Sequence, residues 1–238
     1  MRFCKKLCAY LLTAALAVTT LAAGACAAEV PESLKPWLNS KTGKAMAQMA
    51  GEKAYIEMSV GGETVTTARS GGKSYTCIQL PDDGGKYVTI VRDGYTYEIL
   101  SMPSLVLKSQ NETAPLDVSL GEVKDVVEAE GVSYTITPAR QKVGDKVYDA
   151  EILTLTQGEV SSAITYCFEG DTLRYVVTKD SEGAESITEY KKISTDVDES
   201  LFELPAGVPV YVQTAEGTLV DEAGNPVDMA AFYALFMQ

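Results

Sequence analysis

The sequence predicts an α+β protein that is mainly antiparallel β-sheet, a meander of roughly ten strands with short helical insertions. Short runs alternate between apolar and polar residues, as in AYIEMSV and KYVTIVR. Turn-forming pairs separate the runs, among them Gly61-Gly62, Gly71-Gly72 and Asp93-Gly94, and such punctuation favours hairpins. The strand runs also follow one another as a meander and do not alternate with helices, which argues against βαβ units.

The first 28 residues have the organisation of an export signal. A cationic start with Arg2, Lys5 and Lys6 precedes an uncharged apolar run over residues 7–23 and the small residues AAGACAAE. We expect residues 1–28 to be removed, which places the mature protein outside the cytoplasm. Two alternatives are open for the cut. An ordinary signal peptidase suits the small residues before Glu29, whereas residues 23–26 resemble a lipobox that would make Cys26 an acylated anchor on the outer face of the cell membrane.

The chain is strongly acidic. It has 20 basic and 33 acidic residues, and removal of the signal leaves 17 basic against 33 acidic residues, a net charge of −16. Such a domain lacks the basic patch that displaces counterions from phosphates. The composition therefore predicts no nucleic-acid partner, and contact with a membrane only through the N-terminal anchor.

Histidine is absent from the whole sequence. Its absence excludes Ser-His-Asp and Cys-His catalysis and every metal site that uses histidine. We expect no metal ion and no cofactor. Cys77 and Cys167 either form a disulfide, as the extracytoplasmic location permits, or lie buried separately.

The elements follow in order along the chain. A short helix is expected over residues 37–49, with Pro36 in its first turn, and a second over residues 121–129, after a capping box of Ser119 and Glu122. Residues 102–131 otherwise interrupt the strands. The C-terminal MAAFYALFMQ predicts a short helix capped by Asp228. The expected strands are AYIEMSV, ETVTTARS, KSYTCIQL, KYVTIVR, YTYEIL, VSYTIT, KVYDAEILTLT, SAITYCF, LRYVVTK, ESITEYKKIS and VPVYVQT.

Two motifs suggest chemistry without supporting it. Ser70-Gly-Gly-Lys73 matches the spelling S-x-x-K of serine hydrolases, but that chemistry needs a helix start, and Gly71-Gly72 predicts a hairpin turn. Asp196, Asp198 and Glu199 lack the glycine and terminal glutamate of an EF-hand loop. No catalytic residue is predicted, and the chain is not expected to be an enzyme.

The phrase SLFELPAG resembles a motif of the LolA/LolB-like superfamily of bacterial lipoprotein carriers and their lipid-binding relatives. In those proteins a helix precedes a meander of strands, and a phrase of the form I-x-x-…-D-x-x-x-F-x-L-P-x-G follows it. The residues that fill these places here are Ile193, Asp198, Phe202, Leu204, Pro205 and Gly207. Read physically, Phe202 and Leu204 would plug an open end of the sheet, and Pro205 would end the pairing.

The resemblance implies a strongly curved, incomplete β-barrel over residues 29–207, with short helices covering its concave face and residues 208–238 as a C-terminal extension. It also implies an apolar cavity between sheet and helices. We expect the function to be an extracytoplasmic, non-catalytic binding module or carrier for a lipid, acyl chain or other apolar molecule. The alternative is a structural or protein-interaction domain of the cell envelope with a filled core. Candidate inner-face residues are Ile56, Met58, Ile90, Ile99, Ile136, Ile152 and Tyr166.

Overall fold

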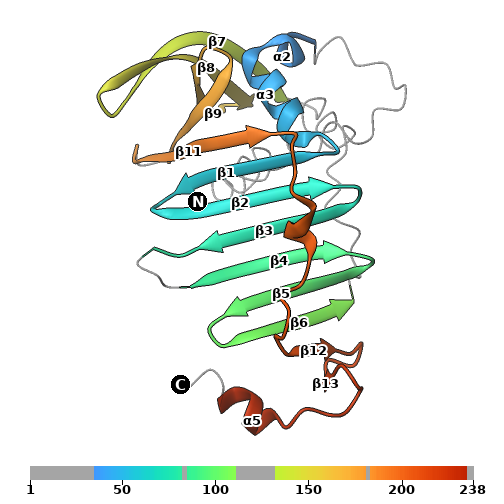
Figure 1. Ribbon diagram of the computed structural model, residues 1–238. Coiled ribbons are helices and arrows are strands. Elements are labelled where there is room, and N and C mark those ends of the chain that lie inside the picture. Colours follow the sequence, from blue (N-terminus) through green and yellow to red (C-terminus); the bar gives the residue numbers. More distant parts are fainter. Residues whose placement is uncertain (1–34, 82–84, 111–131, 181–182, 235–238) are drawn as a thin grey trace.

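The computed structural model describes residues 35–81, 85–110, 132–180 and 183–234, which form one open sheet with a few short helices (Figure 1). The strand order is β13-β12-β6-β5-β4-β3-β2-β1-β11-β10-β9-β8-β7. Every neighbouring pair is antiparallel except β6 and β12, which are parallel. The strands are β1 (Ala54–Val60), β2 (Glu63–Ser70), β3 (Lys73–Gln79), β4 (Lys86–Arg92), β5 (Tyr95–Ser101), β6 (Ser104–Gln110), β7 (Val132–Val143), β8 (Lys146–Gln157), β9 (Val160–Glu169), β10 (Thr172–Lys179), β11 (Glu185–Ser194), β12 (Val210–Gln213) and β13 (Leu219–Asp221).

The sheet consists of two meanders that one long-range pairing joins. Strands β1 to β6 form the first meander and β7 to β11 the second, each through hairpins. Strand β11 then pairs with β1, from Tyr55 opposite Ser194 to Val60 opposite Thr188. The outer edges β7 and β13 do not pair with each other, so the described sheet stays open.

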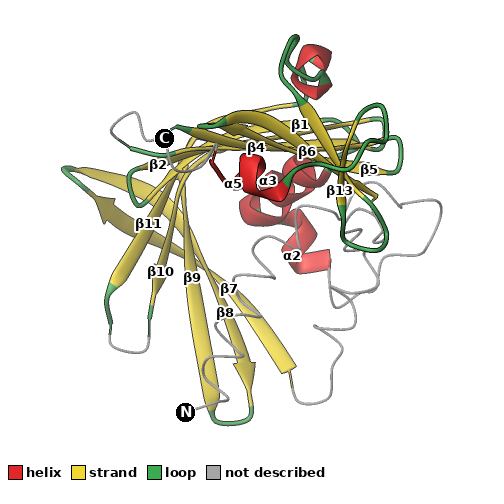
Figure 2. Ribbon diagram, turned by 90° about the horizontal axis from the view of Figure 1, so that it is seen from below, coloured by secondary structure: helices red, strands yellow, loops and turns green. Residues whose placement is uncertain are grey.

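The sheet is strongly curved, and its short helices lie on the concave side. Seen from below, β1 to β6 form one wall and β7 to β11 turn away from it, with α2 (Lys35–Asn39) and α3 (Lys41–Ala50) in the angle between them (Figure 2). The predicted class, a curved and incomplete barrel of mainly antiparallel strands with short helices on its concave face, is confirmed. The described residues form thirteen strands, against the roughly ten that were predicted.

Two strand predictions need correction. Residues 104–110 were expected to lie outside the sheet, yet they form β6 between β5 and β12. Their sequence, SLVLKSQ, is apolar on both faces at its start, so it lacks the alternation that marks a half-buried strand. Strand β7 continues through Pro138 to Val143. It tolerates the proline because β7 is an edge strand.

The first helix is broken where one continuous helix over residues 37–49 was predicted. Ser40 has extended backbone angles, and its hydroxyl accepts a hydrogen bond from the Gly43 N–H at 2.9 Å, so it caps a new helix, α3. Gly43 permits the fold-back, because a Cβ at this position would lie 2.0 Å from the Trp37 carbonyl oxygen. The predicted contacts Trp37, Met46 and Met49 are all buried.

The helices and the strands facing them share one hydrophobic cluster, called here the inner core. It fills the concave angle under α3 and joins both meanders through β1. Its buried members are Trp37, Ala45, Met46, Met49, Ala50, Ile56, Ile164, Tyr166, Phe168, Leu173 and Val176.

The opposite, convex face of β1 to β6 carries a second cluster, called here the strap core. Residues 195–209, called the strap, leave β11 and cross this face to reach β12 (Figure 1). They include the short 3-10 helix η3 (Glu199–Phe202). The buried members of the strap core are Ala68, Ile90, Tyr97, Val106 and Phe202.

Residues after the strap extend the same sheet. Strand β12 pairs with β6, from Val210 opposite Val106, and helix α5 (Met229–Ala234) follows β13. Asp228 precedes α5 and its carboxylate accepts from the Ala230 N–H at 2.9 Å, as the predicted cap requires. Among the described residues, no helix has the length and apolar character needed to span a bilayer.

We predict that Gly43→Ala destabilises the protein by about 2 kcal/mol, since overpacked positions cost on this order and the added methyl meets main-chain atoms that cannot rotate away. Denaturant unfolding followed by circular dichroism measures the change. Gly51→Ala is the matched control, because a Cβ there meets its nearest atoms at 3.4 Å. Equal stability of the two variants would show that α2 does not pack closely on α3.

Candidate functional site

An open hollow of about 560 Å³ is lined by residues of α2, of its C-terminal end and of strands β7 and β8. Figure 2 shows α2 on the concave side of the sheet, facing these two strands. Helix α2 and its C-terminal end form one wall, and the edge of the β7–β8 hairpin forms the other. The lining residues are Pro36, Ser40, Tyr134, Thr135, Ile136, Pro138 and Glu151.

The walls of the hollow are mostly apolar, and two of its polar residues, Ser40 and Glu151, make hydrogen bonds within the protein. Tyr134 and Ile136 project from β7 and pack against the inner core. The Ser40 hydroxyl donates to the Trp37 carbonyl and accepts from the Gly43 N–H. A ligand in this hollow would therefore meet apolar surface first.

Glu151 fastens α3 to strand β8. Its Oε1 accepts from the Lys41 N–H at 3.1 Å and its Oε2 accepts from the Thr42 N–H at 2.7 Å. The first N–H groups of a helix have no acceptor within the helix itself, and the helix dipole favours a negative charge at this end. Glu151 meets both needs. The Lys41 side chain also forms an ion pair with Asp171 at 3.2 Å. Glu151 and Asp171 together therefore hold the start of α3 against the second meander.

The inner core behind the hollow is filled. Tyr166 and Phe168 are each 2% exposed, and Met46 and Met49 of α3 cover them. Burial raises the pKa of the Tyr166 phenol, so that side chain is neutral at ordinary pH. The packed helices α2 and α3 thus separate the hollow from the interior of the inner core.

Two polar groups of the helix pair are buried without a hydrogen-bond partner among the described residues, Trp37 Nε1 and Thr42 Oγ1. Trp37 belongs to α2, and its side chain is 5% exposed. Thr42 belongs to the first turn of α3 and is fully buried. Buried donors without an acceptor are rare in folded proteins, and each costs stability.

The seven predicted inner-face residues divide between the two faces. Ile56, Met58, Ile136 and Tyr166 lie on the concave side, and of these Ile136 lines the hollow. The placement of the other three is corrected. Ile90 and Ile99 belong to the strap core on the convex face. Ile152 is opposite Thr165, one position out of phase with the inner-core pair Leu153 and Ile164, so it also lies on the convex side.

Sequence reasoning missed most of the lining. Tyr134 stands two residues before Ile136 and shares its face, so strand alternation was a usable signal. Glu151, Ser40 and Pro36 carried no such signal, because their proximity depends on how α2 and α3 settle against β8.

Cys77 and Cys167 are free and buried separately. They lie on β3 and β9, which are five strand positions apart in the sheet, so the expected alternative of separate burial holds. Burial raises the pKa of the Cys167 thiol to about 11. Cys26, the export signal and the helix predicted over residues 121–129 lie outside the described residues.

From the sequence, Phe202 and Leu204 of the strap were expected to close an open end of the sheet. They do not. Instead Phe202, 1% exposed, packs onto the middle of the convex face with Leu201 and Leu204 beside it. The reason is that η3 turns the chain toward the sheet. Asp198 starts this turn by accepting from the Ser200 N–H at 2.9 Å.

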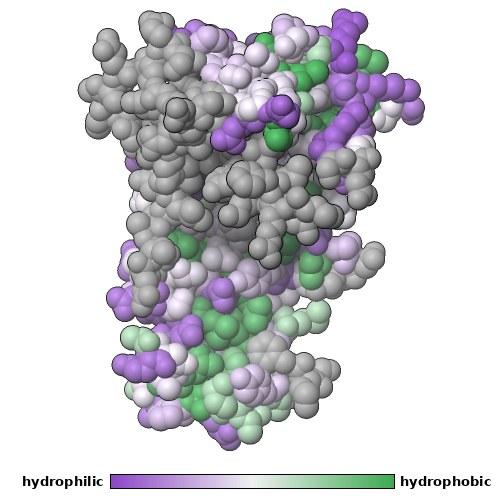
Figure 3. Space-filling view, turned by 180° about the vertical axis from the view of Figure 1, so that it is seen from behind, coloured by the Kyte–Doolittle hydropathy of each residue, from purple (hydrophilic) through white to green (hydrophobic). Residues whose placement is uncertain are grey.

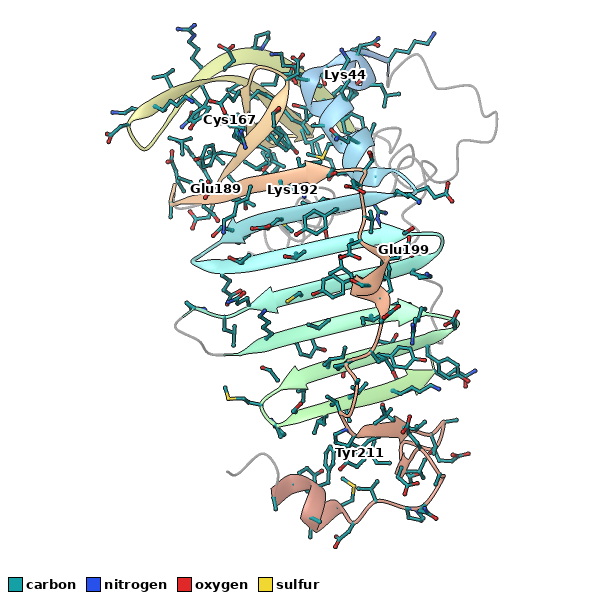
Figure 4. All side chains as sticks on the ribbon, viewed as in Figure 1. Lys44, Cys167, Glu189, Lys192, Glu199 and Tyr211 are labelled. Carbon is teal, nitrogen blue, oxygen red and sulfur yellow. The ribbon has the colours of Figure 1, made fainter. Side chains whose placement is uncertain are left out.

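Ser70 and Lys73, the residues of the S-x-x-K spelling, hold the strap in place. The Ser70 hydroxyl donates to Glu199 Oε1, and Lys73 Nζ lies 3.0 Å from Glu199 Oε2. Lys73 Nζ also lies 5.5 Å from the centre of the Phe202 ring. Figure 4 shows Glu199 on the strap, in front of the sheet. The two residues flank the β2–β3 turn, as predicted, and act as a clasp on Glu199.

Within the described part of the chain, no group of three or more histidine, cysteine or carboxylate side chains is arranged to hold a metal ion. Asp196, Asp198 and Glu199 belong to the strap turn, where Asp198 and Glu199 make the capping and clasp contacts.

Apolar side chains also gather at the end of the sheet that β12, β13 and α5 build (Figure 3). Phe232 packs edge-on to Tyr211 with ring centres 5.1 Å apart. Met229 and Tyr233 of α5 are 39% and 62% exposed. This end therefore presents apolar surface without a described cover.

We predict that Glu151→Ala destabilises the protein by about 2 kcal/mol, because two helix N–H groups lose a charged acceptor. Glu151→Gln should recover part of the loss, since an amide oxygen still accepts one bond. Denaturant unfolding measures both variants, with Glu159→Ala, an exposed glutamate in the next turn, as control. A loss in Glu151→Ala no larger than in the control would refute the anchoring role.

We predict that acid weakens the strap through Glu199. The Ser70 hydroxyl bond, and then Lys73, lower the pKa of Glu199. A lowered pKa contributes stability above the unfolded value, about 4.3, and this contribution is lost as pH falls through the folded pKa.

The measurement is the free energy of unfolding against pH for the wild type and Glu199→Gln. The difference between them should shrink below about pH 4. Glu203→Gln, an exposed carboxylate on the same strap, serves as control. Parallel pH curves for the wild type and Glu199→Gln would contradict the clasp.

No family model and no curated protein matches this sequence. Similar solved structures include an uncharacterized conserved protein from Thermus thermophilus, at 9% identity and a TM-score of 0.42, covering 72% of this chain and 96% of that one. The complex of Pseudomonas aeruginosa MucA and MucB is similar over 65% of this chain and 55% of that chain, at 11% identity and a TM-score of 0.34.

A LolA superfamily protein, NE2245 from Nitrosomonas europaea, is also similar, at 12% identity and a TM-score of 0.25, over 64% of this chain and 88% of that one. The structures similar to this chain thus include a member of the superfamily that residues 193–207 resemble.

Proposed function

We propose that this chain is an extracytoplasmic, non-catalytic binding protein or carrier for a lipid, an acyl chain or another apolar molecule. The observation that carries the proposal is the hollow on the concave side of the sheet. Its volume, about 560 Å³, falls in the range of 300–1,000 Å³ typical of sites for small molecules. A lining of apolar side chains with few polar groups is also typical of such sites.

Binding would be driven by removal of apolar surface from water, at roughly 25 cal/mol per Å². Pro36, Tyr134 and Ile136 supply that surface at the hollow. No bond is made or broken, in keeping with a chain that contains no histidine.

The helix that borders the hollow is suited to move. Helix α2 has five residues, and Trp37 is its one buried member. It is joined to α3 at Ser40, and α3 itself is fastened by Glu151. We therefore propose that α2 swings about Ser40 to admit a chain, while Ile56, Met58 and Tyr166 form the deeper surface that a long ligand would reach.

A second candidate function is protein binding in the cell envelope. It is favoured by the filled inner core, and by the exposed Met229 and Tyr233 at the end of the sheet. In this case the concave hollow would be incidental and the apolar end would be covered by a partner.

We predict that the protein binds apolar acyl probes and that Ile136→Asp weakens binding at least tenfold, because the charge would have to be buried against the ligand. Trp37 is the sole tryptophan of the sequence, so its fluorescence reports events at α2. Ile187→Asp is the matched control, since Ile187 is an exposed strand residue of β11 at 41% exposure.

The control should bind like the wild type, and circular dichroism checks that both variants fold. If the wild type takes up no acyl probe and retains none after purification, the carrier proposal fails. Capture of a specific envelope protein that depends on Tyr233 would then support the second candidate.

A further inference from the structure

The two edges of the sheet end differently. Strand β13 has three residues, and the chain itself lies along its outer side. There the Asp221 N–H donates to the Asn225 carbonyl at 2.9 Å, and the Val227 N–H donates to a carbonyl of β13 at 3.1 Å. Strand β7 has twelve residues and, among the described residues, pairs only with β8. An unpaired strand edge invites pairing with another chain, so folded proteins usually protect it.

On β7 such protection is confined to the second half of the strand. Pro138, Arg140 and Lys142 stand there at alternate positions, and proline and exposed cations are residues that discourage the addition of a strand. The Arg140 side chain is 79% exposed. Residues 132–137, VSYTIT, contain neither a proline nor a charge and are rich in the types that favour strands. Residues 132–137 are therefore the unprotected part of this edge.

Pro138 also shows which main-chain groups of β7 face outward. It lies opposite Glu151 of β8 but has no N–H to exchange with that residue, so its main chain faces away from β8. The register of the two strands runs without a shift over residues 132–143. The direction of the main-chain groups alternates along a strand, so the N–H and C=O of Ile136 and of Arg140 face outward as well.

The hollow opens beside the unprotected edge. Thr135 and Ile136 both line it, although the side chains of consecutive strand residues point to opposite faces. Because β8 occupies the inner side of β7, the hollow reaches both residues along the outer edge. Figure 1 shows β7 at the outer end of the sheet, with α2 beside it. A strand added at this edge would run past the hollow and place a side chain in it.

We propose that an extended segment of another protein adds to the sheet as a strand along residues 132–137. It exchanges main-chain hydrogen bonds with Ile136 and places an apolar side chain in the hollow. In this mode of recognition the main chain supplies affinity and the pockets for alternate side chains supply specificity. The inference goes beyond the carrier function, and it places protein binding at β7 instead of at the α5 end of the sheet.

The charge of the protein indicates the kind of segment. The mature chain has 17 basic and 33 acidic residues, a net charge of −16, so a second copy of the same chain is repelled. Glu151 is the charged residue of the described lining. Complementary charge at an interface favours the right partner and rejects others. The segment that fits is therefore uncharged or basic, with apolar residues at alternate positions.

The test begins with a display library of random short peptides selected on the mature protein. We expect the enriched peptides to alternate apolar and polar residues and to lack acidic ones. A labelled synthetic copy of the most enriched peptide is then titrated with the wild type, Ile136→Ala and Ile136→Pro, and fluorescence anisotropy gives the three affinities.

The two variants separate the main chain from the side chain. Both shorten the side chain of Ile136, but only Ile136→Pro removes the outward N–H. Ile136→Pro should therefore bind about tenfold more weakly than Ile136→Ala, the usual worth of one neutral hydrogen bond. Arg140→Pro is the matched control, because it removes an N–H that faces the same way but lies beyond Pro138. It should bind like the wild type, and circular dichroism checks that each variant folds.

A measurement on the wild type alone avoids any defect of the variants. Amide hydrogen exchange followed by NMR should slow at Ile136 when the peptide is added and stay unchanged at Arg140. Unchanged exchange at Ile136 under saturating peptide would overturn the inference.

The remaining outcomes are equally decisive. A library that yields no binder, or only acidic ones, overturns the inference, as does equal weakening in Ile136→Pro and Arg140→Pro. A concentration-dependent dimer that Ile136→Pro abolishes would assign the edge to a second copy and overturn the proposal of another protein. None of these results touches the carrier function, which uptake of an acyl probe tests separately.

Discussion

The pairing of β11 with β1 is the constraint on which the rest of this structure depends. It joins residues as distant as Tyr55 and Ser194 and converts two independent hairpin meanders into one curved sheet. Helix α3 is followed almost at once by β1. The pairing of β1 with β11 therefore also places α2 and α3 in the angle where the two meanders meet. Without it, each meander would expose an additional edge and the inner core would lose the surface that β9 and β10 provide.

A curved sheet of this kind must be covered on both faces, because its strands are apolar on both. Alternation along β1 sends Ile56 into the inner core and Tyr55 into the strap core. The helices cover the first and the strap covers the second. Glu199 is held by Ser70 and Lys73 and fixes the strap at its middle. The two residues that match the S-x-x-K pattern of serine hydrolases therefore have a structural role here.

Among the described residues, the helices cover the concave side only in part. Helix α3 is ten residues long and α2 only five, and the break between them leaves part of β7 and β8 without a helix above it. Glu151 stabilises the break by accepting from the first N–H groups of α3. The same region holds the buried polar groups of Trp37 and Thr42, which have no hydrogen-bond partner in the described part of the chain.

The sequence by itself determined most of the strands, their hairpin turns and the burial of Trp37, Met46 and Met49, because alternation and turn residues act locally. It also determined the acidic charge and the absence of histidine chemistry. Only the tertiary structure decided which face of the sheet each strand residue took: Ile90, Ile99 and Ile152 were expected beside Ile56 but lie on the other side. A period of two tells which residues of one strand share a face, yet the face that becomes concave is set by strand order and by where the helices and strap settle. For the same reason the sequence did not predict Glu151 and Ser40 in the candidate site. Their proximity depends on contacts between residues more than a hundred positions apart in the chain.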